Sequence, residues 1–285
     1  MKLYAPSTIR EIRDRFGFRF SKSLGQNFLT DKNIIDQILE GSGITGDDLV
    51  IEIGPGIGVI TREAAQLAHK VIAIEIDTNL IPILNWTLGD LENVEIVNQD
   101  VLKTQLNDLI AKESFPGVVR VVGNLPYYIT TPIIMKLLED QVPAASITVM
   151  MQKEVADRLT AKPGTKDFGA ISLMVEYFAE AKEIVKVPRT VFVPQPNVDS
   201  TVLRLDIRDE KPVKVEDEEF LFKVIKAGFG QRRKTLSNAL SVLKGYDKAT
   251  ILRCLEEAGI DPVRRGETLS LEEYARLSDV LRSAI

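Results

Sequence analysis

The chain has 285 residues, of which 45% are hydrophobic and 27% are charged, and its formal net charge is −5. This balance is typical of a folded globular protein, and the length is sufficient for one large and one small domain. Because the sequence has no run of about 18 apolar residues and its first residues lead into charged ones, we expect no membrane span and no secretory signal, and hence a cytoplasmic protein without a membrane partner.

Between Leu49 and Met151, short apolar runs alternate with amphipathic segments, which predicts a parallel sheet flanked by helices. The predicted strands are Leu49 to Ile53, Val71 to Ile76, Val94 to Asn98, Val118 to Val122 and Ile147 to Met151. The predicted helices are Ile60 to Ala68, Leu80 to Leu88, Leu106 to Lys112, Pro132 to Leu138 and Lys153 to Leu159. Thr131 is expected to cap the helix that begins at Pro132. Five strands in this order indicate a doubly wound, Rossmann-like sheet of the α/β class.

Further elements are expected to complete the first domain. A helix is predicted from Ile171 to Phe178, and strands are predicted from Glu183 to Val187 and from Thr201 to Ile207. The segment from Val191 to Ser200 contains two prolines and is expected to be an extended loop between these strands.

The pattern changes after residue 208. Residues 209–219 are charged, include a proline and have few large apolar side chains, which is typical of a linker that runs into the acidic start of a helix. The remaining sequence has helical periodicity, with Gly259 as a predicted helix end and Ser270 and Glu273 as a predicted capping box. We therefore predict a first domain of residues 1–208, which includes a basic N-terminal extension of residues 1–24, and a small all-helical domain of residues 209–285.

A glycine-rich turn follows the first predicted strand. Gly54, Gly56 and Gly58 come directly after Ile53, and a helix is predicted to follow them. Glycines at such a turn let the backbone approach a ligand closely, and the start of a helix offers free amide hydrogens. The spacing is G-x-G-x-G instead of G-x-G-x-x-G, so a nicotinamide cofactor is less favoured, although it stays open, as does a tight turn without a ligand.

Two acidic residues end the next two predicted strands. Glu75 follows the glycines by about 20 residues, at the position where a carboxylate can accept hydrogen bonds from both hydroxyls of a ribose. Asp100 ends the third strand, where an acceptor can bind the amino group of an adenine. Either carboxylate alone is compatible with a solvated surface charge. Because both stand beside a glycine turn, we predict a ligand that contains adenosine.

The tetrapeptide Asn124-Leu125-Pro126-Tyr127 follows the fourth predicted strand, at the sheet edge where open α/β proteins bind ligands. The Asn124 side-chain oxygen and the Pro126 carbonyl are two hydrogen-bond acceptors, and Tyr127 is a stacking surface. An aromatic amine would match this set. If both acceptors bind the amine hydrogens, its lone pair can point at an electrophile without a strong general base.

The sequence offers little support for nucleophilic or metal-assisted chemistry. Cys254 is the only cysteine, which excludes an intramolecular disulfide and a multi-cysteine zinc site, and no metal is expected. It lies in a helical apolar stripe and is expected in the core. His69 is the only histidine and is expected at the surface near a helix end. The chemistry is therefore expected to come from a cofactor, carboxylates and backbone dipoles.

Five different motifs are spread along the chain. They are Gly25 to Leu29, the glycine turn at Gly54, Glu75 with Asp100, Asn124 to Tyr127, and Phe192 to Ser200. Together they resemble the S-adenosylmethionine-dependent ribosomal RNA adenine N6-dimethyltransferases, over nearly the whole chain. The segment from Gln231 to Leu236 and the helical tail resemble the branch that acts on small-subunit RNA. That branch dimethylates two adjacent adenines near the 3′ end of the RNA and takes part in subunit maturation.

The resemblance implies S-adenosylmethionine as the cofactor and gives roles to individual residues. Asn27 and Leu29 would approach its methionine end, together with the turn at Gly54 and Gly56. Three further residues would hold the adenosine part of the cofactor. Glu75 would bind the ribose, and Asp100 and Val101 would bind the adenine.

The resemblance also implies how the substrate is held. Asn124 would bridge the cofactor and the substrate adenine. A base inside a helix cannot reach such a pocket, so the target adenine has to be flipped out, and Tyr127 and Phe192 would cover its two faces. A position in the core is the structural alternative for Phe192.

A net charge of −5 is unusual for a protein that binds RNA, but the cations are clustered. The predicted RNA-binding residues of the helical domain are Lys223, Lys226, Arg232, Arg233 and Lys234. A second basic cluster lies near the N-terminus and consists of Arg10, Arg13, Arg15, Arg19 and Lys22. Phosphate contacts need local positive charge and not a positive total, although each cluster is also compatible with a solvated helix face.

We therefore expect a monomeric enzyme that dimethylates adenines in the RNA of the small ribosomal subunit, bound as a late assembly intermediate. Three alternatives stay open. The first is a methylase of large-subunit RNA, of the kind that confers macrolide resistance. The second is a non-catalytic RNA-binding assembly or transcription factor on the same fold, and the third is a methyltransferase for a small metabolite.

Overall fold

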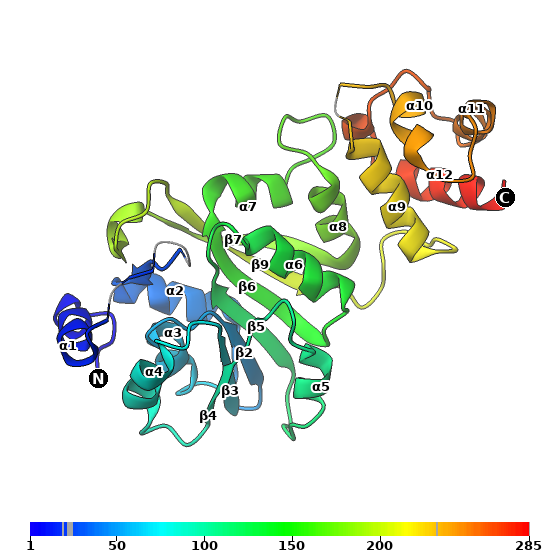
Figure 1. Cartoon of the computed structure of the whole chain (residues 1–285). Helices are drawn as coiled ribbons and strands as arrows, with labels where there is room; N and C mark the ends of the chain where they lie inside the picture. The colour runs from blue at the N-terminus through cyan, green and yellow to red at the C-terminus, as the bar shows by residue number, and fades with distance from the viewer. Residues whose placement is uncertain (19, 22–24, 232, 285) are drawn as a thin grey trace. The chain divides into compact units, whose positions relative to one another are not determined.

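The structure of the chain is a computed structural model, and it describes residues 1–18, 20–21, 25–231 and 233–284. The chain divides into two units (Figure 1). The first unit consists of Met1–Ala156 and Glu180–Ile207, and the second consists of Asp157–Ala179 and Arg208–Ile285. The second unit therefore includes a segment, Asp157–Ala179, that precedes the predicted linker. Whether residues 1–208 and 209–285 fold independently stays a prediction.

Within the described residues, seven strands form one mixed sheet in the order β4-β3-β2-β5-β6-β9-β7. They are β2 (Leu49–Ile53), β3 (Lys70–Glu75), β4 (Val94–Asn98), β5 (Val119–Asn124), β6 (Ala144–Gln152), β7 (Ala179–Val187) and β9 (Ser200–Ile207). Strands β2 to β6 pair in parallel, and β9 pairs antiparallel with β6. The predicted doubly wound sheet is confirmed. The strand order reverses at β2 and β5, and the carboxyl ends of strands at such a point are where open sheets bind ligands.

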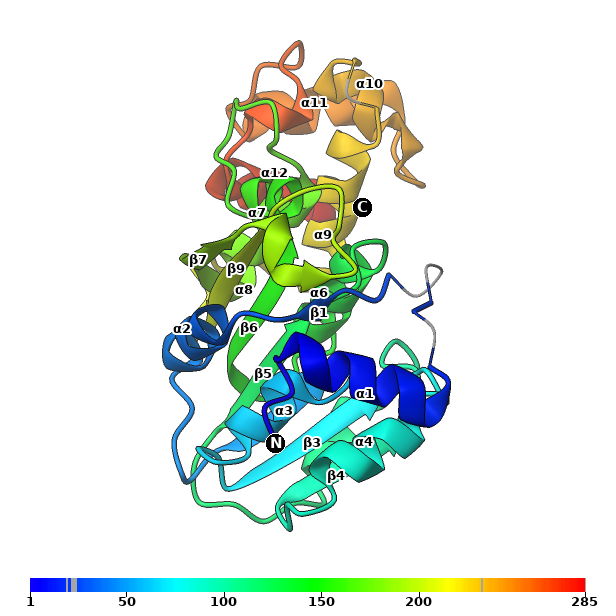
Figure 2. The same cartoon turned by 90° about the vertical axis from the view of Figure 1, so that its left-hand side faces the viewer.

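Helices cover both faces of this sheet (Figures 1 and 2). They are α1 (Pro6–Phe16), α2 (Lys32–Ser42), α3 (Val59–Ala64), α4 (Ile81–Leu88), α5 (Leu106–Ile110), α6 (Thr130–Glu139) and α7 (Lys153–Leu159). One hydrophobic core joins α1 to α4 to one face of the sheet, through side chains such as Ile35, Ile83 and Val50. All five residues of β2 are buried, as expected for a central parallel strand with helices on both sides.

The N-terminal region contains two helices that the sequence analysis did not predict. Helix α1 has Pro6 in its first turn and buries Ile9 and Ile12. Helix α2 is capped by Asp31, whose side chain accepts hydrogen bonds from two backbone N–H groups of the first turn. The described part of the basic N-terminal extension is therefore largely helical.

Several predicted helix boundaries differ from the structure, most clearly those of α6 and α3. Helix α6 begins at Thr130 and not at Pro132, so Thr131 lies inside the helix and does not cap it. The reason is that the turn after β5 already closes onto the helix, since the Thr130 hydroxyl donates to the Pro126 carbonyl at 3.0 Å. Helix α3 ends at Ala64, and the residues up to His69 form turns and bends.

A second, two-stranded sheet joins distant parts of the chain. Strand β1 (Phe28–Leu29) pairs antiparallel with β8 (Phe192–Val193), so that Leu29 lies opposite Phe192. The predicted loop from Val191 to Ser200 therefore contains a short strand near its start. This pairing ties the segment that precedes α2 to the segment that follows β7.

The second unit is helical. It contains α8 (Ala170–Phe178), α9 (Glu218–Phe229), α10 (Leu236–Ala239), α11 (Lys248–Glu257) and α12 (Leu271–Ser283), with short 3-10 turns that include η2 (Leu240–Val242). The predicted capping box of Ser270 and Glu273 is confirmed at the start of α12. Cys254 is buried, as predicted. Among the described residues, no helix is long and apolar enough to cross a membrane.

Candidate active site

A pocket opens in the first unit at the point where the strand order reverses. Its hollow volume is about 1010 Å³, including the open mouth. The loop before α2, the glycine turn, the ends of β3 and β4 and the turn after β5 all contribute to its lining. Ten of the predicted site residues line it, namely Asn27, Leu29, Gly54, Gly56, Glu75, Asp100, Val101, Asn124, Pro126 and Tyr127. The fold thus brings together residues that are up to 100 positions apart.

The glycine turn adopts backbone conformations that other residues rarely reach. Gly54, Gly56 and Gly58 have φ angles of 71°, 61° and 89°. A β-carbon at Gly56 would lie 3.0 Å from the Phe28 ring, so the turn and the loop before α2 approach each other closely. These glycines allow the backbone itself to form one wall of the pocket.

Two buried carboxyl groups line the pocket. Glu75, the last residue of β3, is 5% exposed, and its Oε1 accepts a hydrogen bond from the Asp77 backbone N–H at 2.8 Å. Burial raises the pKa of Glu75 to about 7. Glu52, in β2, is 1% exposed, and burial raises its pKa to about 8. The Glu52 Oε2 atom has no hydrogen-bond partner among the described residues. A ligand that brings hydrogen-bond donors or positive charge would stabilise both carboxylates.

Sequence reasoning missed Glu52. The available signal was its position, because it is the one charged residue in an otherwise apolar strand, Leu49–Ile53, directly before the glycine turn. A charged side chain is rarely buried in a central strand without a partner or a function.

The acidic end of β4 lies at another part of the pocket. Asp100 is half-buried, and its Oδ1 accepts a hydrogen bond from the Leu102 backbone N–H at 3.0 Å. Val101 is 8% exposed and adds an apolar surface beside it. A carboxylate next to an apolar surface suits a flat heterocycle with an amino group.

The orientation of the Asn124 side chain follows from its hydrogen bond. Its Nδ2 donates to the Asn27 backbone carbonyl at 2.9 Å. This bond commits the amide nitrogen to the loop before α2 and leaves the Oδ1 atom as an acceptor toward the pocket. The acceptor role of Asn124 stays a prediction, and this orientation of the amide is compatible with it.

The predicted acceptor role of the Pro126 carbonyl has less support in this geometry. That oxygen accepts hydrogen bonds from the Ile129 backbone N–H at 3.1 Å and from the Thr130 hydroxyl at 3.0 Å, so both of its lone pairs are engaged. The Leu125 carbonyl, one residue earlier, accepts no hydrogen bond from the described residues. Sequence reasoning missed Leu125 because its apolar side chain carries no chemical signal.

Two aromatic side chains of the turn line the pocket. The Tyr127 hydroxyl shares a hydrogen bond of 2.7 Å with the Ser200 Oγ, which fixes its ring, and burial raises the pKa of this hydroxyl. Tyr128 is 59% exposed, which is unusual for so large an apolar ring. Sequence reasoning passed over Tyr128, although it adjoins Tyr127 and offers a second stacking surface at the mouth.

Phe192 does not line the pocket. It is 2% exposed and belongs to the core that joins α1 to α4 to the sheet, and its strand β8 pairs with β1. In this structure the ring cannot cover a face of a substrate base. The structural alternative, a position in the core, is the one observed, because an apolar ring next to a strand pairing is excluded from water.

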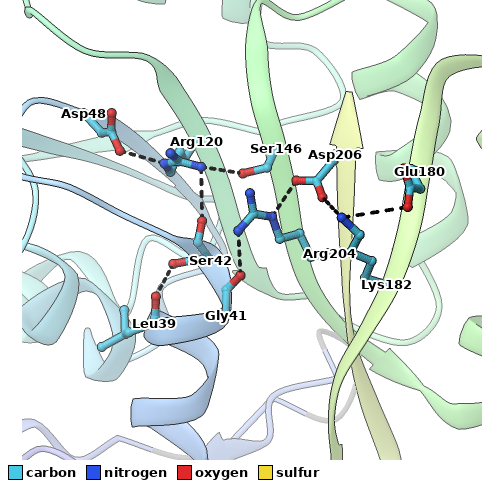
Figure 3. Close-up of polar contacts among 10 residues, drawn as sticks. All are labelled: Leu39, Gly41, Ser42, Asp48, Arg120, Ser146, Glu180, Lys182, Arg204 and Asp206. Carbon is cyan, nitrogen blue, oxygen red and sulfur yellow. Dashed lines mark hydrogen bonds and ion pairs between the residues drawn. The ribbon is translucent and has the colours of Figure 1, made fainter. Parts of the chain in front are cut away.

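The loop that lines the pocket leads into α2, and two arginines of the sheet hold the end of that helix (Figure 3). Arg120 of β5 donates from Nη1 to the Ser42 carbonyl at 3.2 Å, and Arg204 of β9 donates from Nη1 to the Gly41 carbonyl at 3.0 Å. Cations at a helix C-terminus satisfy its unpaired carbonyls and favour its dipole.

Each arginine is itself held by a carboxylate. Arg120 pairs with Asp48 at 2.6 Å, and Arg204 pairs with Asp206 at 2.6 Å (Figure 3). Burial acts to raise the pKa of Asp48, but hydrogen bonds from Arg120 and from backbone N–H groups outweigh it, and the pKa lies below its usual value. This network fixes α2 and thereby the pocket wall from Gly25 to Leu29.

Comparisons with known proteins identify the family. The family model described as ribosomal RNA adenine dimethylase matches residues 17–281. The chain belongs to this family. It is therefore a methyltransferase that uses S-adenosylmethionine.

Other dimethylases and related enzymes are similar over nearly the full length. The chain is 53% identical over 284 residues to the ribosomal RNA small subunit methyltransferase A of Clostridioides difficile (strain 630), which covers 100% of this chain and 98% of that protein. It is 55% identical over 280 residues to the protein of that name from Geobacillus thermodenitrificans (strain NG80-2), with coverage of 97% and 96%.

Solved structures give the same picture. A dimethyladenosine transferase from Plasmodium falciparum has a TM-score of 0.73 and 25% identity, and covers 88% of this chain and 95% of its own. The 23S rRNA methyltransferase ErmE has a TM-score of 0.64 and 29% identity, with coverage of 90% and 99%.

For this dimethylase, the predicted RNA-binding cations of the second unit lie at the surface. Lys223, Lys226, Arg233 and Lys234 are all exposed, while Arg232 lies outside the described residues, as do Arg19 and Lys22 of the N-terminal cluster. Lys223 forms a surface ion pair with Glu219 at 2.7 Å. In the described part of the chain, no group of three or more His, Cys, Asp or Glu side chains could hold a metal ion.

Proposed function

We propose that this dimethylase transfers methyl groups to the N6 amines of two adjacent adenines near the 3′ end of small-subunit ribosomal RNA, giving N6,N6-dimethyladenine. The observation that supports this most is the Asn124 amide, whose nitrogen is bonded to the Asn27 carbonyl so that its oxygen is left to accept. An acceptor held in that orientation matches an amine with hydrogens to donate.

The lining of the pocket fits S-adenosylmethionine, which supplies a methyl group on a positively charged sulfur. Glu75 would accept from the ribose hydroxyls, and Asp100 with Val101 would bind the adenine. Asn27, Leu29, Gly54 and Gly56 would surround the methionine end. The Glu52 Oε2 atom, which has no hydrogen-bond partner within the described ranges, would accept from the ammonium group of the cofactor, which places a buried carboxylate near positive charge.

The chain's contribution to the reaction is the orientation of the amine. The exocyclic nitrogen of adenine is a weak nucleophile because its lone pair is delocalised into the ring. We assign its two acceptors to the Asn124 Oδ1 and the Leu125 carbonyl, in place of the Pro126 carbonyl, because the latter already accepts two hydrogen bonds. Two acceptors at fixed positions make the nitrogen more pyramidal and direct its lone pair, so no strong base is required.

Stacking would hold the flipped base in place. The Tyr127 ring, which is held by the hydrogen bond to Ser200, would stack on one face of the base. The exposed Tyr128 ring would stack on the base where it enters the pocket. Each such stack contributes about 1 to 3 kcal/mol to the binding of an unpaired base. We leave Phe192 with a packing role, since it supports β1 and hence Leu29.

The names of the relatives support the choice of RNA in this proposal. Proteins about 53% identical over the full length act on the small ribosomal subunit, as their names state, and this supports small-subunit RNA over the large-subunit RNA of the ErmE type. We further propose that a monomer acts in the cytoplasm on a late assembly intermediate of the subunit.

The test is to incubate the protein with isotope-labelled S-adenosylmethionine and unmethylated small subunits, to digest the RNA, and to identify the labelled nucleosides by mass spectrometry. We expect N6,N6-dimethyladenosine from two adjacent positions. Label found only when large-subunit RNA is supplied would favour the macrolide-resistance type, and no label in either RNA would favour a non-catalytic assembly factor.

A further inference from the structure

The second unit has a groove of its own, formed by α9, α10, η2 and the segment that follows η2. Helices α9 and α10 are labelled in Figures 1 and 2. Its hollow volume is about 1250 Å³, including the open mouth. All of its lining residues lie between Phe220 and Tyr246, so the groove belongs to the second unit alone.

The ionisable side chains at the rim of this groove are cations. Lys223, Lys226 and Lys244 line it and are exposed, and no acidic residue is among its described lining. Glu219 pairs with Lys223 outside the lining, but both side chains are more than half exposed, and such a pair on a helix surface contributes little. A groove with this rim favours an anion.

The positive charge continues past the end of α9. Arg233 and Lys234 are exposed, and neither forms an ion pair with a described residue. The occupant that matches the rim is therefore a chain with several negative charges in a row and not a single small anion.

The floor of the groove is apolar. Val242 is 57% exposed, although it is an aliphatic residue, and Leu243 is half-buried beside it. Phe220 and Tyr246 stack with their ring centroids 6.2 Å apart, and the Tyr246 hydroxyl donates to the Leu281 carbonyl at 2.9 Å. The ring positions are therefore fixed before any ligand binds.

Double-stranded RNA would contact the groove through its phosphates and would use only the cations of the rim. An unpaired nucleotide presents a phosphate and an apolar base face together, and so matches both the rim and the floor. We propose that this groove binds an unpaired nucleotide of the ribosomal RNA, with the base against Val242 and Phe220 and the phosphates on Lys223, Lys226 and Lys244. The proposal rests on the function proposed above, because it takes the RNA partner from it, and it adds a second binding site for that RNA.

The first test compares two exposed valines of the second unit. Val242 is 57% and Val263 is 68% exposed, and only Val242 lines the groove. We expect Val242→Asp to weaken binding to unmethylated small subunits by about ten- to hundredfold, an effect comparable to the loss of one base–aromatic stack, because the new carboxylate removes the apolar contact with the base and repels the phosphates. Val263→Asp adds the same charge outside the groove and should change the affinity less than about twofold. Equal affinities for the two variants, with equal melting temperatures, would overturn the proposal.

Salt dependence gives a second test at an exposed lysine. Lys244→Gln should lower the slope of log affinity against log salt concentration by about 0.7, the value for one phosphate contact on a single strand. Lys248→Gln, a change outside the groove lining, should leave the slope unchanged. An unchanged slope for Lys244→Gln contradicts the proposed phosphate contact.

The third test identifies the occupant directly. A photoreactive phenylalanine derivative placed at Val242 should crosslink to ribosomal RNA when whole small subunits are irradiated. A crosslink to a ribosomal protein would overturn the proposal in favour of a protein partner. If the wild-type protein binds and crosslinks but transfers no methyl group, the proposed function fails while the groove assignment stands.

Discussion

The pocket in the first unit and the groove in the second unit differ in the charge of the residues that line them. The pocket at the sheet edge is lined by the carboxyl groups of Glu52, Glu75 and Asp100, whereas the groove in the helical unit is lined by the ammonium groups of Lys223, Lys226 and Lys244. The first set suits a cofactor with positive charge and hydroxyl groups, and the second suits a polyanion. A net charge of −5 conceals this division, because it averages over both units.

The two linings also differ in burial. Glu52 and Glu75 are 1% and 5% exposed, so each needs a ligand group to stabilise its charge, while the lysines are exposed to solvent. Cofactor binding should therefore depend strongly on pH and weakly on salt. RNA binding at the groove should depend strongly on salt.

The largest expected effect is at Asn124, which faces the pocket but carries no charge. Asn124→Ala should lower the methyl-transfer rate by about a hundred- to a thousandfold, because one acceptor for the amine is lost. Cofactor affinity, measured by calorimetry, should change by less than about tenfold. Asn107→Ala, at an asparagine of α5 that bonds to the Asp140 carbonyl, serves as the control. Near-normal turnover of Asn124→Ala would refute its role.

A smaller effect is expected for the acids of the pocket. Glu75→Ala should weaken S-adenosylmethionine binding by about ten- to a hundredfold, since hydrogen bonds to a charged group contribute about 1.5 to 3 kcal/mol. Glu92→Ala removes an exposed acid and should have no effect. If both variants bind the cofactor equally well, Glu75 does not hold the ribose.

Two arginines support the pocket wall by holding the end of α2, and their removal should affect the stability of the fold. Arg120→Ala should lower the free energy of unfolding by about 2 to 3 kcal/mol, because it leaves the buried Asp48 without its cation. Arg204→Ala should cost about 1 kcal/mol, since its partner Asp206 is 28% exposed. Denaturant unfolding measures both, and a larger loss for Arg204→Ala would contradict this ranking.

The smallest expected effect is the number of protons that the protein releases when the cofactor binds. Burial raises the pKa of Glu52 to about 8 and that of Glu75 to about 7, from a usual value of 4.5, so the unliganded protein holds protons that the unfolded chain has released. Its stability should therefore fall as the pH rises from about 4.5 to 8. A cofactor that favours both carboxylates should release roughly one proton or more on binding at pH 6.5, and its affinity should rise toward pH 8.

Calorimetry in buffers of different ionisation enthalpy measures this release. Glu52→Gln should reduce it, because one of the two titrating groups is gone. Proton uptake, or no exchange at all, would show that the two acids stay protonated beside the cofactor.

The sequence was a good guide wherever local patterns determine the result. Strands ending in Glu75, Asn98 and Asn124 are consecutive apolar runs, and parallel strands bring their carboxyl ends to one edge, so the acids and the asparagine could be placed together in advance. The capping box at Ser270 was predicted from its own residues.

Other features depend on contacts that no local pattern records. The pairing of Leu29 with Phe192 involves strands of two residues, which are too short for a period, and it decides that Phe192 is buried. The earlier start of α6 engages the Pro126 carbonyl, whereas the Leu125 carbonyl accepts no hydrogen bond from the part of the chain that the structure describes. Glu52 could have been suspected, but only the three-dimensional structure shows that its Oε2 atom has no hydrogen-bond partner among the described residues.

Cofactor binding is assigned to the pocket and RNA binding to the groove, and the most direct test of this division is a crossed affinity measurement. Glu75→Ala and Val242→Asp are each titrated with S-adenosylmethionine and, separately and without cofactor, with unmethylated small subunits. We predict that Glu75→Ala loses only cofactor affinity and that Val242→Asp loses only RNA affinity. If a correctly folded variant loses both affinities, or if neither variant loses the one assigned to it, the division is wrong.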